Sequence, residues 1–529
     1  MIQYGLKSGI GHRASGIGHR ASGIGHRASG IGHRASGIGH RASGIGHRAS
    51  GIGHRASGIG HRLVKKLSFF DKTAFWFKLL VLSVLWMVSY YSHGILSNTS
   101  QRSIMGNAPE IIVLPSLLNS FGFTINNEFY SQSNNNIAQD MIKLVDGNLT
   151  FNDFKQQDIH ALLANFDIAQ HYYDQEGDPV DLTEPFTIQS VKHIWYDNKD
   201  QQIPESDFGK IIGCGSGYSM PLKLNIKVTV STQSQFGSPR QSEPVTLSKS
   251  YQIAPISELC YAKPNSMIVK PDKQWGGVDK TTDTYFWNQA KYAMRDSLTG
   301  GGYTQDFVPN YGFKAEPVLS DKKFPTTGFP GAKFQLVMTG AQTDYRFELL
   351  NNQGQAVTID QNGMVQLNAK PSGAIKVRAT LLRDDSIMHD YVFNPTNPWI
   401  EPQDFRSNFD DTLGKCGGLQ YMLTMEELTN SPRYEVKANV QDSGDTVLIL
   451  SNTYTREIGN SVLGEWGWTT KTTYPDSQWQ DYSMPFKSRY WTTKINAYLM
   501  TGYVVHNHDG FVGAFLLYDD RLGYAVCKK

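Results

Sequence analysis

Cysteine is scarce in this sequence, and the cysteines that occur are far apart. The 529 residues contain four of them: Cys214, Cys260, Cys416 and Cys527. No C-x-x-C pair occurs, which excludes the usual zinc ribbon and the usual dithiol redox motif. All four follow a long apolar run at residues 74–91. An even number on that side is typical of two disulfides in an oxidising compartment, with four buried free thiols as the alternative.

Signatures of catalysis are also missing. The chain contains no G-x-S-x-G, H-E-x-x-H or P-loop motif, so the common hydrolase, metalloprotease and nucleotide-binding chemistries have no motif here. One glutamate, Glu465 in the stretch SVLGEWGWTT, would suit a general acid if a second carboxylate lay about 5–10 Å away. Asp476 and Asp481 are the candidates for that partner. We expect a protein that is not an enzyme, with no catalytic residue and no cofactor.

Acidic residues are absent from the first 62 positions. The net charge of +2 is made of +9 in residues 1–62, +3 in residues 63–97 and −10 in the rest of the chain. An acidic globular part argues against nucleic acid as a partner. From Gly9 the heptad GIGHRAS occurs seven times, and GIGHR closes the run at Arg62. Two glycines in every seven residues oppose helix formation, so we expect residues 1–62 to be disordered.

One long apolar run follows this repeat. Residues 74–91 read AFWFKLLVLSVLWMVSYY and carry a single charge, Lys78. The run is short for a membrane-spanning helix and long for a signal-peptide core. Residues 63–97 are therefore predicted to be either a cleaved signal peptide or a signal-anchor transmembrane helix, and an anchor would make the membrane a partner. Basic residues precede the run and the acidic part follows it, which predicts export of the C-terminal part. The N-terminus is cytoplasmic if the helix is not cleaved.

Alternating apolar residues indicate β-strands in the exported part. In PLKLNIKVTVS, the residues from Leu222 to Val230 alternate between apolar and polar, which predicts a half-buried strand. Short strands and turns without long helices are typical of a β-sandwich. We therefore predict an immunoglobulin-like sandwich over residues 168–262, and we assign no fold to residues 98–167.

A second β unit is predicted over residues 321–395. Its clearest signal is Asn362-Gly363, because both central positions of a tight hairpin turn favour positive φ. Residues 263–320 are interpreted as a connecting region between the two β units.

Two groups of residues have metal-ligand chemistry. The turn YYDQEGDPV and the residues after it supply four carboxylates: Asp174, Glu176, Asp178 and Asp181. They suit a shared calcium ion or a solvated acidic turn. Near the C-terminus, His506 and His508 share a face if they lie on a strand, and Asp509 follows them. This trio suits zinc or a plain hairpin turn. We favour the turn in both cases, so we predict no metal and keep the four carboxylates as metal candidates.

The last part, residues 396–529, mixes patterns of helix and strand. Amphipathic stretches at Glu401–Leu413 and Thr424–Leu428 predict two short helices on either side of Cys416. The stretch NAYLMTGYVVH is strand-like.

Tryptophans are concentrated in this last part. We expect Trp466 and Trp491 to lie in the core, and Trp468 and Trp479 to be exposed. An exposed indole offers a flat apolar face that suits a sugar ring or a protein partner.

The order of these features resembles the C-terminal adhesion module of invasin E-type and intimin-like bacterial adhesins, in which an immunoglobulin-like domain precedes a C-type-lectin-like domain. The pattern W…C…GG-L…LT…LGEWG…YWT…GYAVCK carries the resemblance, closely over roughly residues 320–529 and loosely over 168–260. The matching residues are Trp399, Cys416, Leu419, Leu428, Leu463, Glu465, Trp466, Gly467, Tyr490, Trp491, Thr492 and Cys527. The sequence departs from the family in lacking a recognisable outer-membrane barrel, and Gln420–Thr424 replaces L-P-T before the second helix.

The resemblance implies a mostly β protein of tandem immunoglobulin-like sandwiches with a C-terminal α+β C-type-lectin-like domain at residues 396–529. It also implies a bridge between Cys416 and Cys527, which closes a loop of about 110 residues. Cys214 and Cys260 are expected to be structural as well. The residues expected to bind a ligand are Trp468, Trp479, Tyr482, His506, His508 and Asp509.

The function implied by the resemblance is adhesion. We expect a bacterial cell-envelope adhesin, at the surface or in the periplasm, whose head binds a host or neighbouring-cell surface protein or glycan without catalysis. The alternatives are a membrane-tethered periplasmic structural protein, such as a degenerate adhesin paralogue, and an envelope glycan hydrolase.

Overall fold

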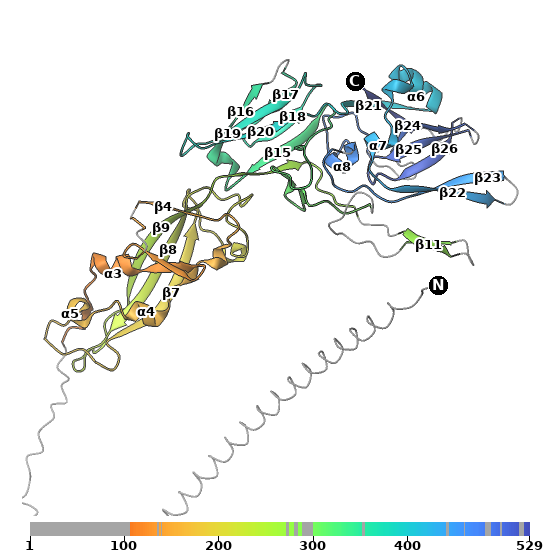
Figure 1. The fold of residues 1–529 in the computed structure, drawn as a ribbon. Coiled ribbons are helices and arrows are strands. Elements are labelled where there is room, and N and C mark those ends of the chain that lie inside the picture. Colours follow the sequence, from red (N-terminus) through yellow and green to blue (C-terminus); the bar gives the residue numbers. More distant parts are fainter. Residues whose placement is uncertain are drawn as a thin grey trace, which may run out of the picture. The chain divides into compact units, whose positions relative to one another are not determined.

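The computed structural model describes residues 106–529 with several gaps. The gaps are residues 135–136, 139, 271–274, 280–283, 288–299, 352–354, 441–443, 460, 482–487, 498–499 and 518–522. The heptad repeat and the predicted signal or anchor helix at residues 63–97 lie outside the described residues. In the part that is described, no helix combines the length and the apolar character that crossing a membrane requires. The described residues belong to one compact unit, and it is mostly β (Figure 1).

The first domain is built on a four-stranded sheet of order β4-β9-β8-β7. Its strands are β4 (Ile142–Val145), β7 (Phe186–Tyr196), β8 (Leu222–Thr232) and β9 (Val245–Pro255). A three-stranded sheet of order β3-β2-β5 and the pair β1-β6 complete the domain. These strands are β1 (Glu110–Ile111), β2 (Gly122–Ile125), β3 (Glu128–Ser131), β5 (Lys155–Gln156) and β6 (Tyr172–Tyr173). The short helices are α3 (Pro115–Ser120), α4 (Ile159–Leu163) and α5 (Ile168–His171).

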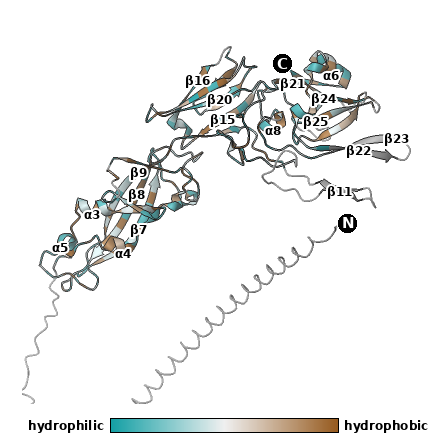
Figure 2. Cartoon of the chain, in the orientation of Figure 1, coloured by the Kyte–Doolittle hydropathy of each residue, from teal (hydrophilic) through white to brown (hydrophobic). Residues whose placement is uncertain are grey.

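Strand β8 shows the alternation that the sequence predicted. Every second residue from Leu222 to Val230 is buried, and the residues between them are partly exposed. Brown bands on this strand mark the apolar positions (Figure 2). Strand β8 pairs antiparallel with β7 on one side and with β9 on the other. It is therefore a central strand with one face on the core.

The core of the first domain begins well before residue 168. One cluster of buried apolar residues includes Leu117 and Phe123 as well as Ile253 in β9. The ring of Trp195 in β7 meets Phe154 edge-on, with centroids 4.9 Å apart. Residues before 168, to which we assigned no fold, thus share a core with the predicted sandwich at 168–262. They do so because α3, α4 and β5 lie against strands β9 and β7.

The second domain has two sheets around one core. The larger sheet has the order β13-β14-β10-β15-β18-β17, and the smaller one has the order β16-β19-β20. The larger contains β10 (Leu259–Pro264), β13 (Phe307–Val308), β14 (Gly312–Lys314), β15 (Ala332–Met338), β17 (Val357–Ile359) and β18 (Met364–Leu367). The smaller contains β16 (Tyr345–Asn351), β19 (Ile375–Leu381) and β20 (Met388–Phe393). A separate pair is β11 (Trp275–Asp279) with β12 (Thr284–Trp287).

This domain confirms the predicted second β-sandwich but begins earlier than expected. Phe334 of β15 and Val377 of β19 belong to the same buried cluster, so the two sheets enclose a common core. Strands β13 and β14 lie within the predicted connecting region, residues 263–320, yet they extend the larger sheet. Strand β14 pairs with β10, and β13 pairs with β14, so this region has a structural role in the sandwich.

The hairpin predicted at Asn362-Gly363 is present, but its turn differs in detail. It joins β17 to β18, and the Gly363 N–H donates to the Asp360 carbonyl at 3.1 Å. Gly363 has φ of 74°, whereas Asn362 is not among the residues with positive φ. The Asp360 carboxylate accepts from the N–H groups of Asn362 and Met364. Because the Asp360 side chain stabilises the turn through these two hydrogen bonds, the turn needs positive φ at Gly363 alone.

The C-terminal head is built on a five-stranded sheet of order β21-β27-β24-β25-β26. The strands are β21 (Ile400–Ser407), β24 (Arg489–Asn496), β25 (Thr501–His506), β26 (Val512–Leu516) and β27 (Gly523–Lys528). Strands β22 (Arg433–Val440) and β23 (Gly444–Ser451) form a separate hairpin. The helices are α6 (Phe409–Cys416), α7 (Met425–Leu428) and α8 (Val462–Trp466).

The helix predicted over Glu401–Leu413 is wrong in its first half. Residues 400–407 form strand β21, which pairs with the last strand, β27. The helix starts only after Asn408, whose side chain accepts from the Asp411 N–H at 2.9 Å. Pairing with a strand more than 100 residues away overrides the local helical pattern. The second predicted helix is confirmed, because Thr424 and Glu427 form a capping box at the start of α7.

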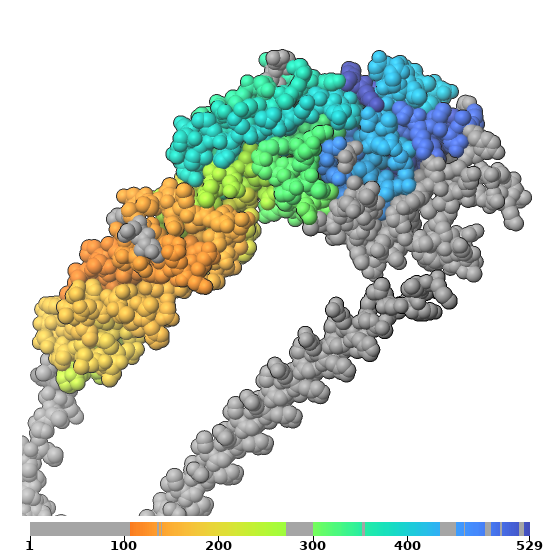
Figure 3. All heavy atoms as spheres, viewed as in Figure 1, coloured from red at the N-terminus to blue at the C-terminus, as the bar shows by residue number. Residues whose placement is uncertain are grey.

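The head and the second domain share one core. Phe324 and Phe334 of the second domain pack against Trp466 of α8 in the head, with ring centroids 4.9 and 6.3 Å apart. Figure 3 shows the green and teal residues in contact with the blue ones over the visible face. Two disulfides are formed, Cys214–Cys260 and Cys416–Cys527. The expected pair of bridges, including the one that the resemblance implied in the head, is therefore confirmed.

Candidate functional site

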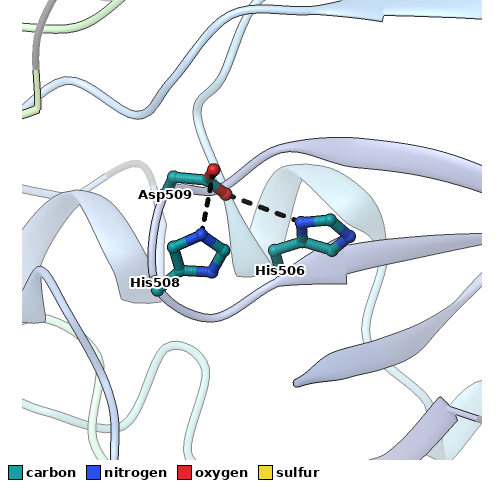
Figure 4. A group of neighbouring side chains, drawn as sticks. All are labelled: His506, His508 and Asp509. Atoms are coloured by element: carbon teal, nitrogen blue, oxygen red, sulfur yellow. Dashed lines mark ion pairs between the residues drawn. The ribbon is translucent and has the colours of Figure 1, made fainter. Parts of the chain in front are cut away.

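The candidate site lies at the turn between strands β25 and β26. His506 is the last residue of β25, and His508 and Asp509 follow in the turn. His508 Nε2 lies 3.1 Å from Asp509 Oδ2, and His506 Nδ1 lies 3.8 Å from Asp509 Oδ1. The three side chains are only 5–12% exposed. Figure 4 shows a nitrogen of each imidazole ring directed toward the carboxylate of Asp509.

The backbone of this turn is held closely. The His506 N–H donates to the Phe511 carbonyl, and the Gly510 N–H donates back to the His506 carbonyl, both at 2.9 Å. Gly510 has φ of 73°, and a Cβ there would lie 2.5 Å from Thr429 Oγ1. Only glycine fits that conformation and that space without strain. The turn therefore presents His506, His508 and Asp509 in a fixed arrangement.

A neighbouring loop brings Trp468 to the same place. Asn507 Nδ2 donates to the carbonyl of Thr469 at 2.7 Å and to that of Gln480 at 2.9 Å. The indole of Trp468 lies against His508, with ring centroids 6.2 Å apart. Lys270 places its ammonium 4.6 Å from the Trp468 ring centroid, a cation–π distance. The structure thus joins four of the predicted ligand-binding residues: Trp468, His506, His508 and Asp509.

Burial and neighbouring groups act in opposite directions on the pKa of Asp509. Burial alone would raise the pKa of its carboxyl. The hydrogen bond and charge of His508, the charge of His506 and the Phe511 N–H outweigh burial and hold the pKa of Asp509 well below its ordinary value. The site thus combines a buried carboxylate with two imidazole rings, and a proton on either ring favours the ionised form of the carboxylate.

Trp479 does not belong to this site, so the prediction that it is exposed is wrong. Its side chain has no exposed surface. The ring meets Tyr490 at 4.9 Å and Phe329 at 5.6 Å, both edge-on. It is buried because the head packs on the second domain at this point, which the local sequence does not reveal. Trp468 is half-buried rather than fully exposed. Tyr482 lies outside the described residues.

Trp466 and Trp491 lie in the core as predicted. Both side chains are fully buried. The Trp466 indole N–H donates to the Thr327 carbonyl at 3.1 Å, and that of Trp491 donates to the Ser407 carbonyl at 2.9 Å. Each indole thus has a partner for its polar atom inside the protein.

Glu465 is a core residue and does not reach a substrate. It has no exposed surface, and its carboxylate accepts the N–H and O–H of both Thr326 and Thr327 and the N–H of Gly459. Burial raises the pKa of Glu465, and the bonds from the two threonines oppose the rise. The glycan-hydrolase alternative, in which Glu465 is the general acid, loses its catalytic residue.

The acidic turn of the first domain uses its carboxylates for internal hydrogen bonds. Asp174 accepts from the N–H groups of Glu176 and Asp178, and Asp181 accepts from Thr183 and is paired with Arg240. Among the described residues, the group with three close metal-ligand atoms is His506, His508 and Asp509. Within the described residues, Asp174, Glu176, Asp178 and Asp181 do not bring three ligand atoms close together.

The first domain contains a cleft that no sequence pattern indicated. This cleft has a volume of about 580 Å³. Phe154, Trp195 and Phe208 contribute aromatic walls, and His193 and Glu205 contribute polar groups. These residues come from separate segments without a common motif, so only the fold brings them together.

His193 gives this domain a predictable response to acid. Burial lowers the pKa of His193 to about 4. An unfolded histidine takes up its proton near pH 6.5, so the unfolded chain gains protons first as the pH falls. Stability that is present above pH 6.5 is therefore lost between about pH 6.5 and pH 4. We expect wild type to lose about 2 kcal/mol more than His193→Gln between pH 7 and pH 4.5, as measured by urea unfolding. If wild type and His193→Gln lose the same free energy of unfolding, His193 is not the cause of the acid sensitivity.

Comparison with known proteins supports the resemblance in the second domain. Residues 309–393 match the family described as invasin, domain 4. The chain thus contains a segment of the invasin type, as the sequence predicted. No curated protein sequence matches the chain.

Solved structures of invasin and intimin align with the chain at low identity. The crystal structure of invasin, a bacterial integrin-binding protein, is 16% identical over 66% of this chain, with a TM-score of 0.30. The chain spans 60% of that invasin chain. An intimin mutant from EHEC O157:H7 is 16% identical over 42% of this chain and 94% of its own, with a TM-score of 0.26. An intimin fragment in complex with the intimin-binding domain of the translocated intimin receptor is 13% identical over 65% and 86% of the two chains, also at 0.26.

Proposed function

We propose that this chain is a bacterial cell-envelope adhesin whose C-terminal head binds a protein on a host or neighbouring cell. The observation that carries the proposal is the match of residues 309–393 to invasin domain 4, followed in the chain by a disulfide-closed head. Invasin is described as integrin-binding and intimin is found with its receptor, so a surface protein is the partner class that we favour over a glycan.

The proposed contact region is the half-buried indole of Trp468 with Lys270 beside it. An aromatic ring with a cation over its face and a rigid turn behind it resembles the anchor residues of protein interfaces. The hydrogen bonds of Asn507 hold the turn in place, so little conformational entropy is lost when a partner binds.

Trp468→Ala should weaken binding without unfolding the head. We expect the full chain, coupled to beads, to bind cultured host cells roughly tenfold less well after this change, since a single anchor is worth 1–2 kcal/mol or more. Tyr173→Ala is the matched control, because Tyr173 is a half-exposed aromatic residue of the first domain. Unchanged binding by Trp468→Ala would remove the proposed contact. Loss of binding after the cells are treated with glycosidase but not with protease would point to a glycan ligand.

Trp479→Ala should act on stability rather than directly on binding. We expect a loss of about 3 kcal/mol in the free energy of unfolding, because a fully buried indole leaves a cavity when it is removed. Urea unfolding followed by tryptophan fluorescence measures this. If Trp479→Ala is as stable as wild type but no longer binds cells, Trp479 belongs to the binding surface instead.

The periplasmic alternative makes a different prediction about location. A structural protein on the inner side of the outer membrane is protected from external protease, whereas a displayed adhesin is not. Treatment of intact cells with a protease, followed by detection of the head, separates the two. Protection of the head on intact cells, with cleavage after lysis, would overturn the surface location.

A further inference from the structure

We propose that His506, His508 and Asp509 bind a divalent transition-metal ion of the zinc class. The donor set is two imidazole nitrogens and one carboxylate, which zinc takes in three-ligand sites with a fourth, open position. Bonds of 2.0–2.2 Å place tetrahedral donors about 3.3–3.6 Å apart. Here one donor atom of each residue lies within 4.8 Å of the others. His508 Nε2 is 3.1 Å from Asp509 Oδ2, and His506 Nδ1 is 3.8 Å from the other carboxylate oxygen, Oδ1. If the two most widely separated donor atoms moved about 1 Å closer together, the three donors would have the spacing of a tetrahedral zinc site.

The surroundings favour such an ion. The three side chains are 5–12% exposed, so they form a nearly closed site. The bonds that Asn507 makes to Thr469 and Gln480 fix the backbone between the two histidines. The Phe511 N–H donates to Asp509 Oδ1 at 3.0 Å, which orients the carboxylate as outer partners of metal ligands do.

The chemistry of the donors selects the ion. Calcium and magnesium prefer oxygen ligands, whereas imidazole nitrogen with one carboxylate suits zinc, cobalt, nickel and copper. A metal here would cross-link the end of β25 to the turn and fix the ring of His508, against which Trp468 packs. The proposal stands independently of the adhesin function, because it rests only on the arrangement of the three side chains.

The test compares full-length wild type with His508→Gln and Asp509→Asn, purified without a histidine tag. After dialysis against equal free Zn²⁺, we expect wild type to hold one more zinc per chain than either variant, by elemental mass spectrometry. The heptad repeat carries eight histidines in every protein, so only the difference reports the site. We expect each variant to lose affinity by at least roughly tenfold, since even outer partners of a ligand contribute that much.

Two further readouts keep the test specific. Zn²⁺ should raise the melting temperature of wild type and not that of Asp509→Asn, because binding to the folded state alone stabilises it. Co²⁺ should give a visible absorption band of a four-coordinate site in wild type only. His160→Ala, in helix α4 of the first domain, is the matched control and should behave as wild type. Equal zinc content in wild type and both variants, with equal thermal shifts, would show a hydrogen-bonded turn that binds no metal.

Discussion

Replacing Cys416 and Cys527 together by serine should destabilise the head by about 4–5 kcal/mol, the larger of the two main expected effects. The disulfide joins residues that are 111 positions apart, so its removal frees a long loop in the unfolded chain. Inside that loop lie strands β24–β26, helix α8 and the candidate site. The measurement is urea unfolding under non-reducing conditions, followed by the fluorescence of the head's buried tryptophans.

The second bridge provides the control for this experiment. Cys214 and Cys260 are 46 positions apart and tie the first domain to strand β10. Their joint replacement by serine should leave the unfolding of the head nearly unchanged. If the Cys416–Cys527 double variant unfolds at the same urea concentration as wild type, the stabilising role assigned to this bridge is wrong.

Glu465→Ala should destabilise the junction between head and second domain by about 4 kcal/mol. Three N–H groups and two hydroxyls, contributed by Thr326, Thr327 and Gly459, would lose their acceptor inside the protein. Each buried donor without a partner costs about 1–3 kcal/mol, and rotation of the hydroxyls recovers part of the loss. Equilibrium unfolding at pH 7 measures the change.

Two further variants test whether the loss comes from the buried hydrogen bonds of Glu465. Glu465→Gln keeps the size of the side chain but turns an amide donor toward other donors, so we expect about half the effect. Asp476→Ala removes a carboxylate that is 49% exposed and paired with Lys333, and should cost less than about 1 kcal/mol. If Glu465→Ala and Asp476→Ala cost the same, the buried network does not stabilise the junction.

Several features followed from local patterns in the sequence. The alternation from Leu222 to Val230 has a period of two, and a strand is the structure that puts such residues on one face. The capping box at Thr424 and Glu427 acts within one turn of helix, so it too is visible locally. The resemblance to invasin-type adhesins was predicted from the order of tryptophans, glycines and cysteines, and the family match falls on residues 309–393, before the head.

Other features depend on pairing across long distances. Residues 400–407 have a helical pattern but are a strand, because β27 completes their hydrogen bonds. Trp479 has the composition of an exposed loop around it but is buried, because Phe329 of the second domain covers it. The burial of Glu465 could not be seen locally either, since its hydrogen-bond donors Thr326 and Thr327 lie 139 and 138 positions away.

The sequence by itself determined the strand-rich class and the order of sandwich and head, because these depend on composition and on short periods. Only the tertiary structure decided which aromatic residues reach the surface and which of the six predicted ligand residues meet. Trp468 comes to His506, His508 and Asp509 through the bonds of Asn507, whereas Trp479 is buried where the domains join. Burial depends on what packs from elsewhere in the chain, and no local pattern contains that information.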